Sequence, residues 1–304
     1  MTESRRGVWY GVAAYGLWGL LPLYWALLEP SGALEILDHR ILWSLAFTLL
    51  LVGLRRHWPA LRAAVRSRRT LVILTAAAVL IAGNWGTYIY GVNSGQVVET
   101  SLGYFINPLV SVALGVLVFR ERLRHLQWIA VGIGAVAVLV LAVDYGRPPY
   151  IALILAFTFG FYGLLKKIVA VPPVQGLAVE SAVLAIPALI SLGVLAARGQ
   201  ATFGTVSGSH TALIMLTGVM TAIPLLFFAA GAPRVPLSTM GLLQYLAPAM
   251  QFALGLTVFG EPMPPGQLIG FVLVWVALSV FTVDLLRHRR RPFVEEPSET
   301  VPAG

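Results

Sequence analysis

The chain has 304 residues, of which 58% are hydrophobic and only 11% are charged. Soluble domains carry about 25% charged residues, so this composition excludes an ordinary water-soluble fold. The formal net charge of +8 does not indicate a nucleic-acid partner, because the basic residues occupy gaps between apolar runs. The absence of cysteine excludes disulfides, thiol catalysis and thiolate metal sites.

Apolar segments follow one another along the chain, each near the length of about 20 residues that a helix needs to cross a bilayer. We therefore predict an all-α polytopic membrane protein with ten transmembrane helices. Residues 1–6 would precede the first helix in the cytoplasm, and the charged, proline-containing residues 287–304 would form a disordered cytoplasmic tail. The expected spans are residues 7–27, 34–54, 70–91, 98–119, 124–143, 149–168, 176–197, 210–231, 237–259 and 265–286.

The basic residues predict the orientation of these spans. Of the 21 lysine and arginine residues, all but three lie in the two terminal segments and in the connections on the same side as them. Arg147 and Arg198 lie on the other side, and Arg40 lies within a span. The positive-inside rule then places both termini in the cytoplasm. The longest inner connection, residues 58–69, is expected to be a solvated basic loop that sets topology, with an interfacial helix as the alternative.

A pattern in the fourth span recurs in the ninth at a constant offset of 140 residues. Phe105-Ile106-Asn107-Pro108 and Phe119-Arg120-Glu121 correspond to Tyr245-Leu246-Ala247-Pro248 and Phe259-Gly260-Glu261. Because five is an odd number of spans, the two copies would run in opposite directions. We predict two inverted five-helix repeats, residues 7–143 and 149–286. This architecture, with a site at the junction of the halves, is typical of secondary transporters.

Two charged residues lie inside expected spans, where insertion of an ionised side chain costs about 2.5–3.5 kcal/mol. Arg40 lies in the second span and Glu180 in the seventh, again 140 residues apart. One interpretation is a central ion pair, or an anion site at Arg40 with Glu180 as the proton carrier. The other is that each side chain extends to its nearer membrane interface, which we favour for Glu180.

Polar side chains recur on one face of the third and fourth spans. Asn84, Tyr88, Tyr104 and Asn107 would line a cavity that orients a polar substrate, the alternative being hydrogen-bonded helix packing. Trp18 lies near the middle of the first span, where it faces a cavity or packs in the core. Aromatic residues near the ends of that span, Trp9, Tyr10, Tyr24 and Trp25, are expected to form an interfacial belt.

Pro108 and Pro248 are expected to kink their spans at positions related by the repeat. A proline frees the carbonyl four residues earlier, and such a carbonyl is tolerated in lipid where it meets protein or a water-filled cavity. Gln244 and Tyr245, next to the second kink, are therefore also predicted to line the substrate site.

Several stretches of this sequence together resemble a known family. They are Tyr15-Gly16-Leu17-Trp18-Gly19 with Pro22 and Tyr24, Glu35 with His39-Arg40-Ile41-Leu42-Trp43-Ser44, Asn84-Trp85 with Tyr88-Ile89 and Val92-Asn93, Ser101 to Leu109, and Glu121-Arg122-Leu123 with Gln127-Trp128. Over residues 7–286 the chain resembles the RarD-type members of the EamA branch of the drug/metabolite transporter superfamily. This resemblance implies ten helices in two inverted repeats, a bacterial inner membrane, and export of small metabolites, often coupled to the proton gradient.

The resulting prediction is a gradient-driven exporter that works by alternating access. Its expected partners are membrane lipid, an unidentified small-molecule substrate and protons, but not nucleic acid, and the oligomeric state is left open. No enzymatic activity, cofactor or metal is expected, because the histidines are scattered and no nucleophile, base and orienting group occur together. The alternative is a non-transporting membrane scaffold or an intramembrane enzyme acting on lipid.

Overall fold

The computed structural model contains helices and no strands over the residues that it describes, which are 3–119, 124–144, 146–169, 171–231, 234 and 243–288. The prediction of an all-α chain is confirmed for these residues. The expected tail beyond residue 288 and part of the ninth span, residues 235–242, lie outside them. The helices are α1 (Glu3–Ala26), α2 (Ala33–Leu54), α3 (Trp58–Arg66), α4 (Arg68–Asn93), α5 (Val97–Phe119), α6 (His125–Asp144), α7 (Tyr150–Val169), α8 (Pro173–Ala197), α9 (Gly208–Gly231), α11 (Leu246–Thr257) and α12 (Pro265–His288).

Six of the described helices are long and apolar enough to cross a membrane, namely α2, α4, α6, α8, α9 and α12. Their outward faces carry large apolar side chains, among them Leu139, Val143, Leu189 and Ile190, and Val143 is 82% exposed. Water would oppose such a surface, whereas lipid chains match it. The exposed apolar surface therefore fits a protein embedded in a bilayer.

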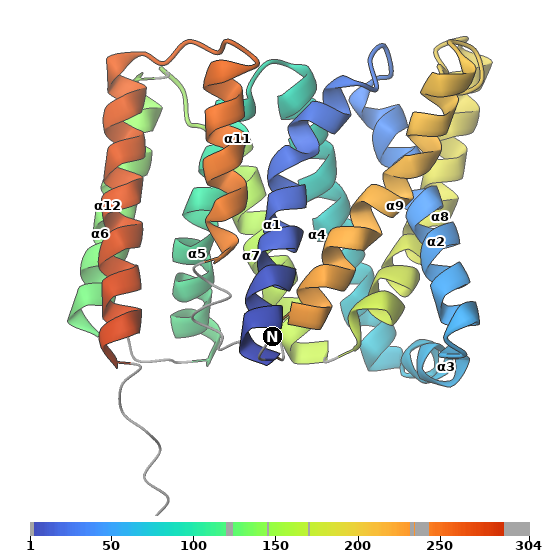
Figure 1. Ribbon diagram of the computed structural model, residues 1–304, viewed down its shortest axis with the longest axis horizontal. Coiled ribbons are helices and arrows are strands. Elements are labelled where there is room, and N and C mark those ends of the chain that lie inside the picture. The colour runs from blue at the N-terminus through green and yellow to red at the C-terminus, as the bar shows by residue number, and fades with distance from the viewer. Residues whose placement is uncertain are drawn as a thin grey trace, which may run out of the picture.

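The long helices stand side by side, and consecutive ones run in opposite directions (Figure 1). The N-terminal end of α1 and the C-terminal end of α12 lie at the same edge of the molecule, the lower edge in Figure 1. The short helix α3 lies at this edge too and packs against α4 and α8. The preferred prediction of a loop at residues 58–69 was wrong for its first part, because Pro59 at the start of α3 and the apolar contacts of its inner face support a helix.

Helices of the two predicted repeats begin at the same spacing. Helices α2 and α8 begin at Ala33 and Pro173, and α6 and α12 begin at His125 and Pro265, in each case 140 residues apart. Contacts between helices recur in the same way: α1 packs on α9 as α7 packs on α4, and α1 packs on α11 as α7 packs on α5. Helix α2 also packs against its counterpart α8, and α6 packs against its counterpart α12.

Helix α2 packs against α4, α8 and α9, and on the face that meets them polar and apolar residues alike are buried. The contact with α9 is very close at Gly218. A Cβ atom at that position would lie 2.3 Å from the carbonyl oxygen of Trp43. The absence of a side chain at Gly218 therefore lets two helices from different halves of the sequence touch.

Two glycines reverse the chain at the upper edge in Figure 1, after α4 and after α8. Gly95 and Gly199 have φ angles of 65° and 68°, a region that favours glycine. Each follows the last helical turn with the paired backbone hydrogen bonds of a Schellman motif, for example Gln96 N to Gly91 O at 2.8 Å. These turns bring the backbone N–H groups of the following residues into reach of acidic side chains from other helices.

Candidate functional site

Arg40 lies at the centre of the candidate site, on the buried face of helix α2. Its side chain is 4% exposed. The guanidinium carbon lies 4.0 Å from the centre of the Trp85 ring on α4 and 5.0 Å from that of Trp25 on α1. Such cation–π contacts hold the guanidinium plane between two indoles. Of the two interpretations left open for Arg40, extension to a membrane interface is therefore wrong for this structure.

Trp25 was expected in the interfacial belt, and this prediction was wrong because the side chain is fully buried. Helix α1 is covered by α9 and α11, and the last turn of α1 packs into the core with Tyr24 and Leu28. Nearness to a helix end is thus a weak indicator of lipid exposure when neighbouring helices cover that end. Trp9, by contrast, is 57% exposed.

Unpartnered polar atoms gather around Arg40. Its Nε and Nη1 atoms and the hydroxyl of Tyr88 are buried without a hydrogen-bond partner. The neighbouring phenols are engaged elsewhere: Tyr24 donates to the carbonyl of Leu213, and Tyr104 donates to Oδ1 of Asn84 at 3.2 Å. Buried donors of this kind normally have partners, so this group of atoms is the part of the interior best prepared to receive a ligand.

The two predicted amides attach α4 and α5 to α7. Asn84 donates to the carbonyl of Leu155 and to the hydroxyl of Thr158, both at 3.0 Å, and Asn107 donates to the carbonyl of Ala156 at 3.1 Å. The amide nitrogens are thus used in helix packing in this structure. Of the four polar residues predicted on these helices, Tyr88 keeps a free hydroxyl, while Asn84 and Tyr104 are bonded to each other.

Trp18 lies where α1 meets α9 and α11. Its ring packs against Tyr15 and Phe228, with ring centroids 5.3 and 6.2 Å away, and its carbonyl accepts from Nε2 of Gln251 at 3.1 Å. Tyr245 is half-buried and packs against the core formed by α5, α6 and α12. Among the described residues, neither Trp18 nor Tyr245 forms a hydrogen bond or a cation–π contact with Arg40.

Two of the remaining predicted residues, Gln244 and Pro248, lie at or near a helix start, and Pro108 lies in the middle of a helix. Pro248 occupies the first turn of α11, where the backbone N–H groups have no intrahelical partner in any case. Gln244 is half-buried and lies just before this helix. Pro108 lies within α5, and its side chain is outside the part of the structure that is described.

Glu180 has a partner of its own. Lys166 Nζ donates to Oε1 at 2.7 Å, and the hydroxyl of Tyr162 donates to Oε2 at 3.1 Å. The carboxylate is buried, with 1% of the residue exposed. The favoured prediction that Glu180 extends to an interface is therefore wrong, and no ion pair joins it to Arg40.

Three other carboxylates, at the upper edge in Figure 1, were not among the predicted site residues; Glu35 and Glu99 are buried and Glu261 is half-buried. Glu35 on α2 accepts from the backbone N–H groups of Thr202 and Phe203 at 2.7 and 3.0 Å. Glu261, in the turn between α11 and α12, accepts from the N–H groups of Val97 and Val98 at the start of α5. Each joins segments of different halves of the sequence.

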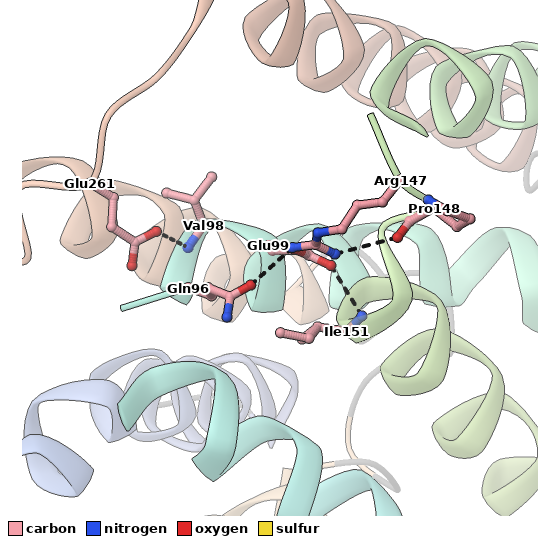
Figure 2. A network of polar contacts seen from close by, with 7 residues as sticks. All are labelled: Gln96, Val98, Glu99, Arg147, Pro148, Ile151 and Glu261. Carbon is pink, nitrogen blue, oxygen red and sulfur yellow. Dashed lines mark hydrogen bonds and ion pairs between the residues drawn. The ribbon is translucent and has the colours of Figure 1, made fainter. Parts of the chain in front are cut away.

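Glu99 is the third of these carboxylates (Figure 2). It is buried, with 2% of the residue exposed, although it lies in the first turn of α5. Arg147 donates to it at 3.0 Å and to the side chain of Gln96 at 3.1 Å, while the N–H of Ile151 donates to its other oxygen at 3.1 Å. The sequence shows only that these acidic residues lie near helix ends. It does not show which backbone N–H groups they bind, because those groups are distant in the chain.

Among the described residues no group of three metal-binding side chains occurs. His39 instead stacks on Phe203, with ring centroids 4.5 Å apart, and His210 hydrogen-bonds to Ser31 at 2.9 Å. These histidines therefore serve as packing and hydrogen-bonding groups at the upper edge. The candidate site is a charged and aromatic interior.

Comparison with known proteins identifies this arrangement. Residues 5–143 match the EamA-like transporter family. The chain is 56% identical to Protein RarD of Streptomyces exfoliatus over 291 residues, which are 95% of this chain and 92% of that protein. It belongs to the EamA-like transporter family, as a RarD-type member. It is also 44% identical to the uncharacterized transporter YojE of Bacillus subtilis over 95% of this chain and 97% of that protein.

A solved structure supports the fold of this EamA family member. Its title is "Crystal structure of protein", and the TM-score is 0.60 at 20% sequence identity, covering 94% of this chain and 99% of that one. The likeness at this identity concerns the arrangement of helices alone. The family model and the relatives make the chain a multi-pass membrane transporter of the drug/metabolite type, and the Bacillus subtilis relative is itself named as a transporter.

Proposed function

We propose that this chain is a secondary transporter that exports a small metabolite by alternating access. It would cross a bacterial inner membrane ten times, as two inverted five-helix repeats at residues 7–143 and 149–286. Both termini would lie in the cytoplasm, since the edge that holds the start of α1 and the end of α12 also holds the basic helix α3.

The observation that carries this proposal is that each contact of α1 with helices of the second half has an equivalent contact of α7 with helices of the first half. Helix α1 contacts α9 and α11, and α7 contacts α4 and α5, which are their counterparts at the repeat spacing. Two halves that make equivalent contacts in opposite orientations have two equivalent ways of packing together. Rocking between these two packings opens the junction alternately to each side of the membrane.

The substrate would bind at the junction around Arg40 and Tyr88, which keep unpartnered polar atoms there. Trp18 lies on α1 and Tyr245 immediately precedes α11, two helices that take part in the junction, and Gln244 adjoins Tyr245. The bonded groups Asn84, Tyr104 and Asn107 would change partners only if α7 moves relative to α4 and α5. Pro108 and Pro248 mark equivalent positions of the two repeats near this junction.

Glu180 is the candidate for ion coupling. A carboxylate buried beside Lys166 and Tyr162 would take up a proton when the lysine withdraws, and would release it to the other side after the halves exchange packing. Replacement Glu180→Gln would then stop accumulation against a gradient, while exchange of substrate across the membrane would continue.

Two measurements test the proposal. Culture medium from cells that overproduce the protein is compared with medium from vector-only cells for a metabolite released in excess. That metabolite is then loaded into liposomes containing the purified chain, and its movement is followed under an imposed pH gradient, with a protonophore as control. A scaffold moves no solute under any gradient, and an intramembrane lipid-acting enzyme changes the lipid instead. Either result would end the transport proposal.

A further inference from the structure

The guanidinium of Arg40 is a buried cation without an anionic partner. Among the described residues it forms no ion pair and no hydrogen bond, and its interacting titratable neighbours are the phenols of Tyr24, Tyr88 and Tyr104. An arginine does not lose its proton in a protein, so its charge stays in the interior. A charge buried without compensation is strongly unfavourable, and this is the feature that needs an explanation.

Acidic side chains of the same region do not supply the missing charge. Glu35 is held by Thr202 and Phe203, and Glu180 is held by Lys166. Asp38 lies two residues before Arg40 on α2, and residues two apart on a helix do not face each other. The partner of Arg40 must therefore come from outside the described part of the chain.

The geometry around Arg40 selects a kind of anion. No described residue accepts a hydrogen bond from any of its three guanidinium nitrogens, of which Nε and Nη1 are fully buried, and the unpartnered hydroxyl of Tyr88 adds a further polar atom. Arginine presents its donors in a planar arrangement that matches a carboxylate, whereas a spherical ion uses fewer of them. Because the described residues of the site offer one cation, the guanidinium of Arg40, the site favours a ligand with a single negative charge.

The walls of the same site are aromatic. The rings of Trp25 and Trp85 flank the guanidinium, and Tyr88 and Tyr104 meet edge to face with ring centroids 5.7 Å apart. Flat apolar walls bury a flat apolar group well and offer few hydrogen bonds to a sugar or a polyol. Because Arg40 is almost fully covered, an anion reaches it only when the surrounding helices separate.

We propose that Arg40 recognises the carboxylate of a small organic monoanion with a planar apolar body, and that Tyr88 completes the polar contact. This names the substrate class of the transport site and rests on the proposed function. The ligand supplies the negative charge that the interior lacks. Arg40 is thereby a specificity-determining residue and not only a support for Trp25 and Trp85.

Binding is tested on the purified full chain in lipid nanodiscs with benzoate as the probe. Benzamide, which has the same shape without the charge, and sodium chloride at equal ionic strength are the controls. Isothermal titration and thermal unfolding should both show that benzoate binds at least about tenfold more tightly than benzamide, as a charged hydrogen bond in a buried site implies.

Three variants assign the effect to this site. Arg40→Met keeps a long unbranched side chain between the indoles, and we expect it to lose the preference for benzoate while unfolding at the same or a higher temperature without ligand. Arg40→Lys keeps the charge but not the planar donors, so benzoate should bind about tenfold more weakly. Tyr88→Phe should weaken benzoate binding and leave benzamide binding unchanged.

Several results would overturn the proposal. They are equal binding of benzamide, no effect of benzoate on the wild type, an unchanged benzoate preference in Arg40→Met, or the same stabilisation by chloride alone. If Arg40→Met does not fold, the wild-type comparison of benzoate with benzamide and the Tyr88→Phe variant still decide. These experiments measure affinity and not movement, so their failure is separate from failure to transport a solute in liposomes.

Discussion

The carboxylate of Glu261 accepts a hydrogen bond from the backbone N–H of Val98 at 2.8 Å (Figure 2). Its other oxygen accepts from the backbone N–H of Val97. The first N–H groups of a helix have no partner within the helix, and a negative charge there is favourable. Glu261 belongs to the turn after α11 and the valines begin α5. One side chain of the second half of the sequence therefore holds the start of a helix of the first half.

Replacement Glu261→Ala is expected to lower the free energy of unfolding by about 1–3 kcal/mol, because it leaves buried N–H groups of α5 without an acceptor. Thermal unfolding of the purified variant in detergent, followed by circular dichroism, measures the change. Glu29→Ala is the matched control, since Glu29 is exposed and lies at the same edge. Equal losses of stability in the two variants would contradict a specific role for Glu261.

The same contact predicts a pH dependence. Burial raises the pKa of the Glu261 carboxyl, while the N–H groups of Val98 and Val97 act to lower it. A carboxyl whose pKa is raised by folding holds its proton more tightly in the folded state. Its contribution to stability is therefore full below the unfolded pKa and is lost as the pH rises through the folded pKa.

Glu261→Gln provides the measurement of this effect, because the amide resembles the protonated carboxyl in shape. From about pH 4 to about pH 8, the stability of the wild type should fall relative to that of Glu261→Gln. Unfolding curves are measured for both proteins across this range. The difference between their free energies of unfolding cancels the contribution of the other titrating groups, which the two proteins share. A constant difference between the two proteins over the whole range would show that Glu261 keeps its ordinary pKa on folding.

The contact between Gly218 and α2 makes a further prediction. A Cβ at residue 218 would lie 2.2 Å from the carbonyl carbon of Trp43, and backbone atoms on both sides leave no flexible group to move away. Gly218→Ala is therefore expected to lower stability by about 1–3 kcal/mol or more, as overpacking does. It should also move α2, and with it Arg40, relative to α9.

Gly193→Ala is the control for this change. A Cβ at residue 193 has nothing within 4 Å, and the position is in the interior of α8. Alanine there should be neutral or stabilising by up to about 1 kcal/mol, because glycine is a poor helix former. The two variants add the same methyl group, so the difference in their unfolding temperatures reports the close approach of α2 and α9.

The arrangement of helices followed largely from hydrophobic length and from the repeat. Spans expected to begin at 34 and 176 appear as helices beginning at Ala33 and Pro173, because a run of about 20 apolar residues has few other solutions in lipid. The amphipathic character of α3 was visible in the sequence too. It was underestimated because an isolated nine-residue helix is marginal, whereas here α4 and α8 support it.

The interior of the site was less accessible from the sequence. Arg40 was identified because a charge in a span is rare, but its contacts with Trp25 and Trp85 depend on how α1 and α4 pack around α2. Glu261 contacts a backbone group 163 residues away, and backbone donors carry no sequence signal. Asn84 and Asn107 were noticed as bulky polar groups, yet only the position of α7 decides what they bind.

The ion pair of Glu180 and Lys166 yields the last prediction. Lys166→Met would leave a buried carboxylate with only the hydroxyl of Tyr162 as a donor, and we expect a loss of about 3 kcal/mol in the free energy of unfolding. The double variant Lys166→Met/Glu180→Met removes both charges and should regain most of that stability. If the double variant is as unstable as the single one, the loss reflects packing of the lysine side chain and not an uncompensated charge. A double-mutant cycle that includes Glu180→Met alone gives the coupling between the two residues directly.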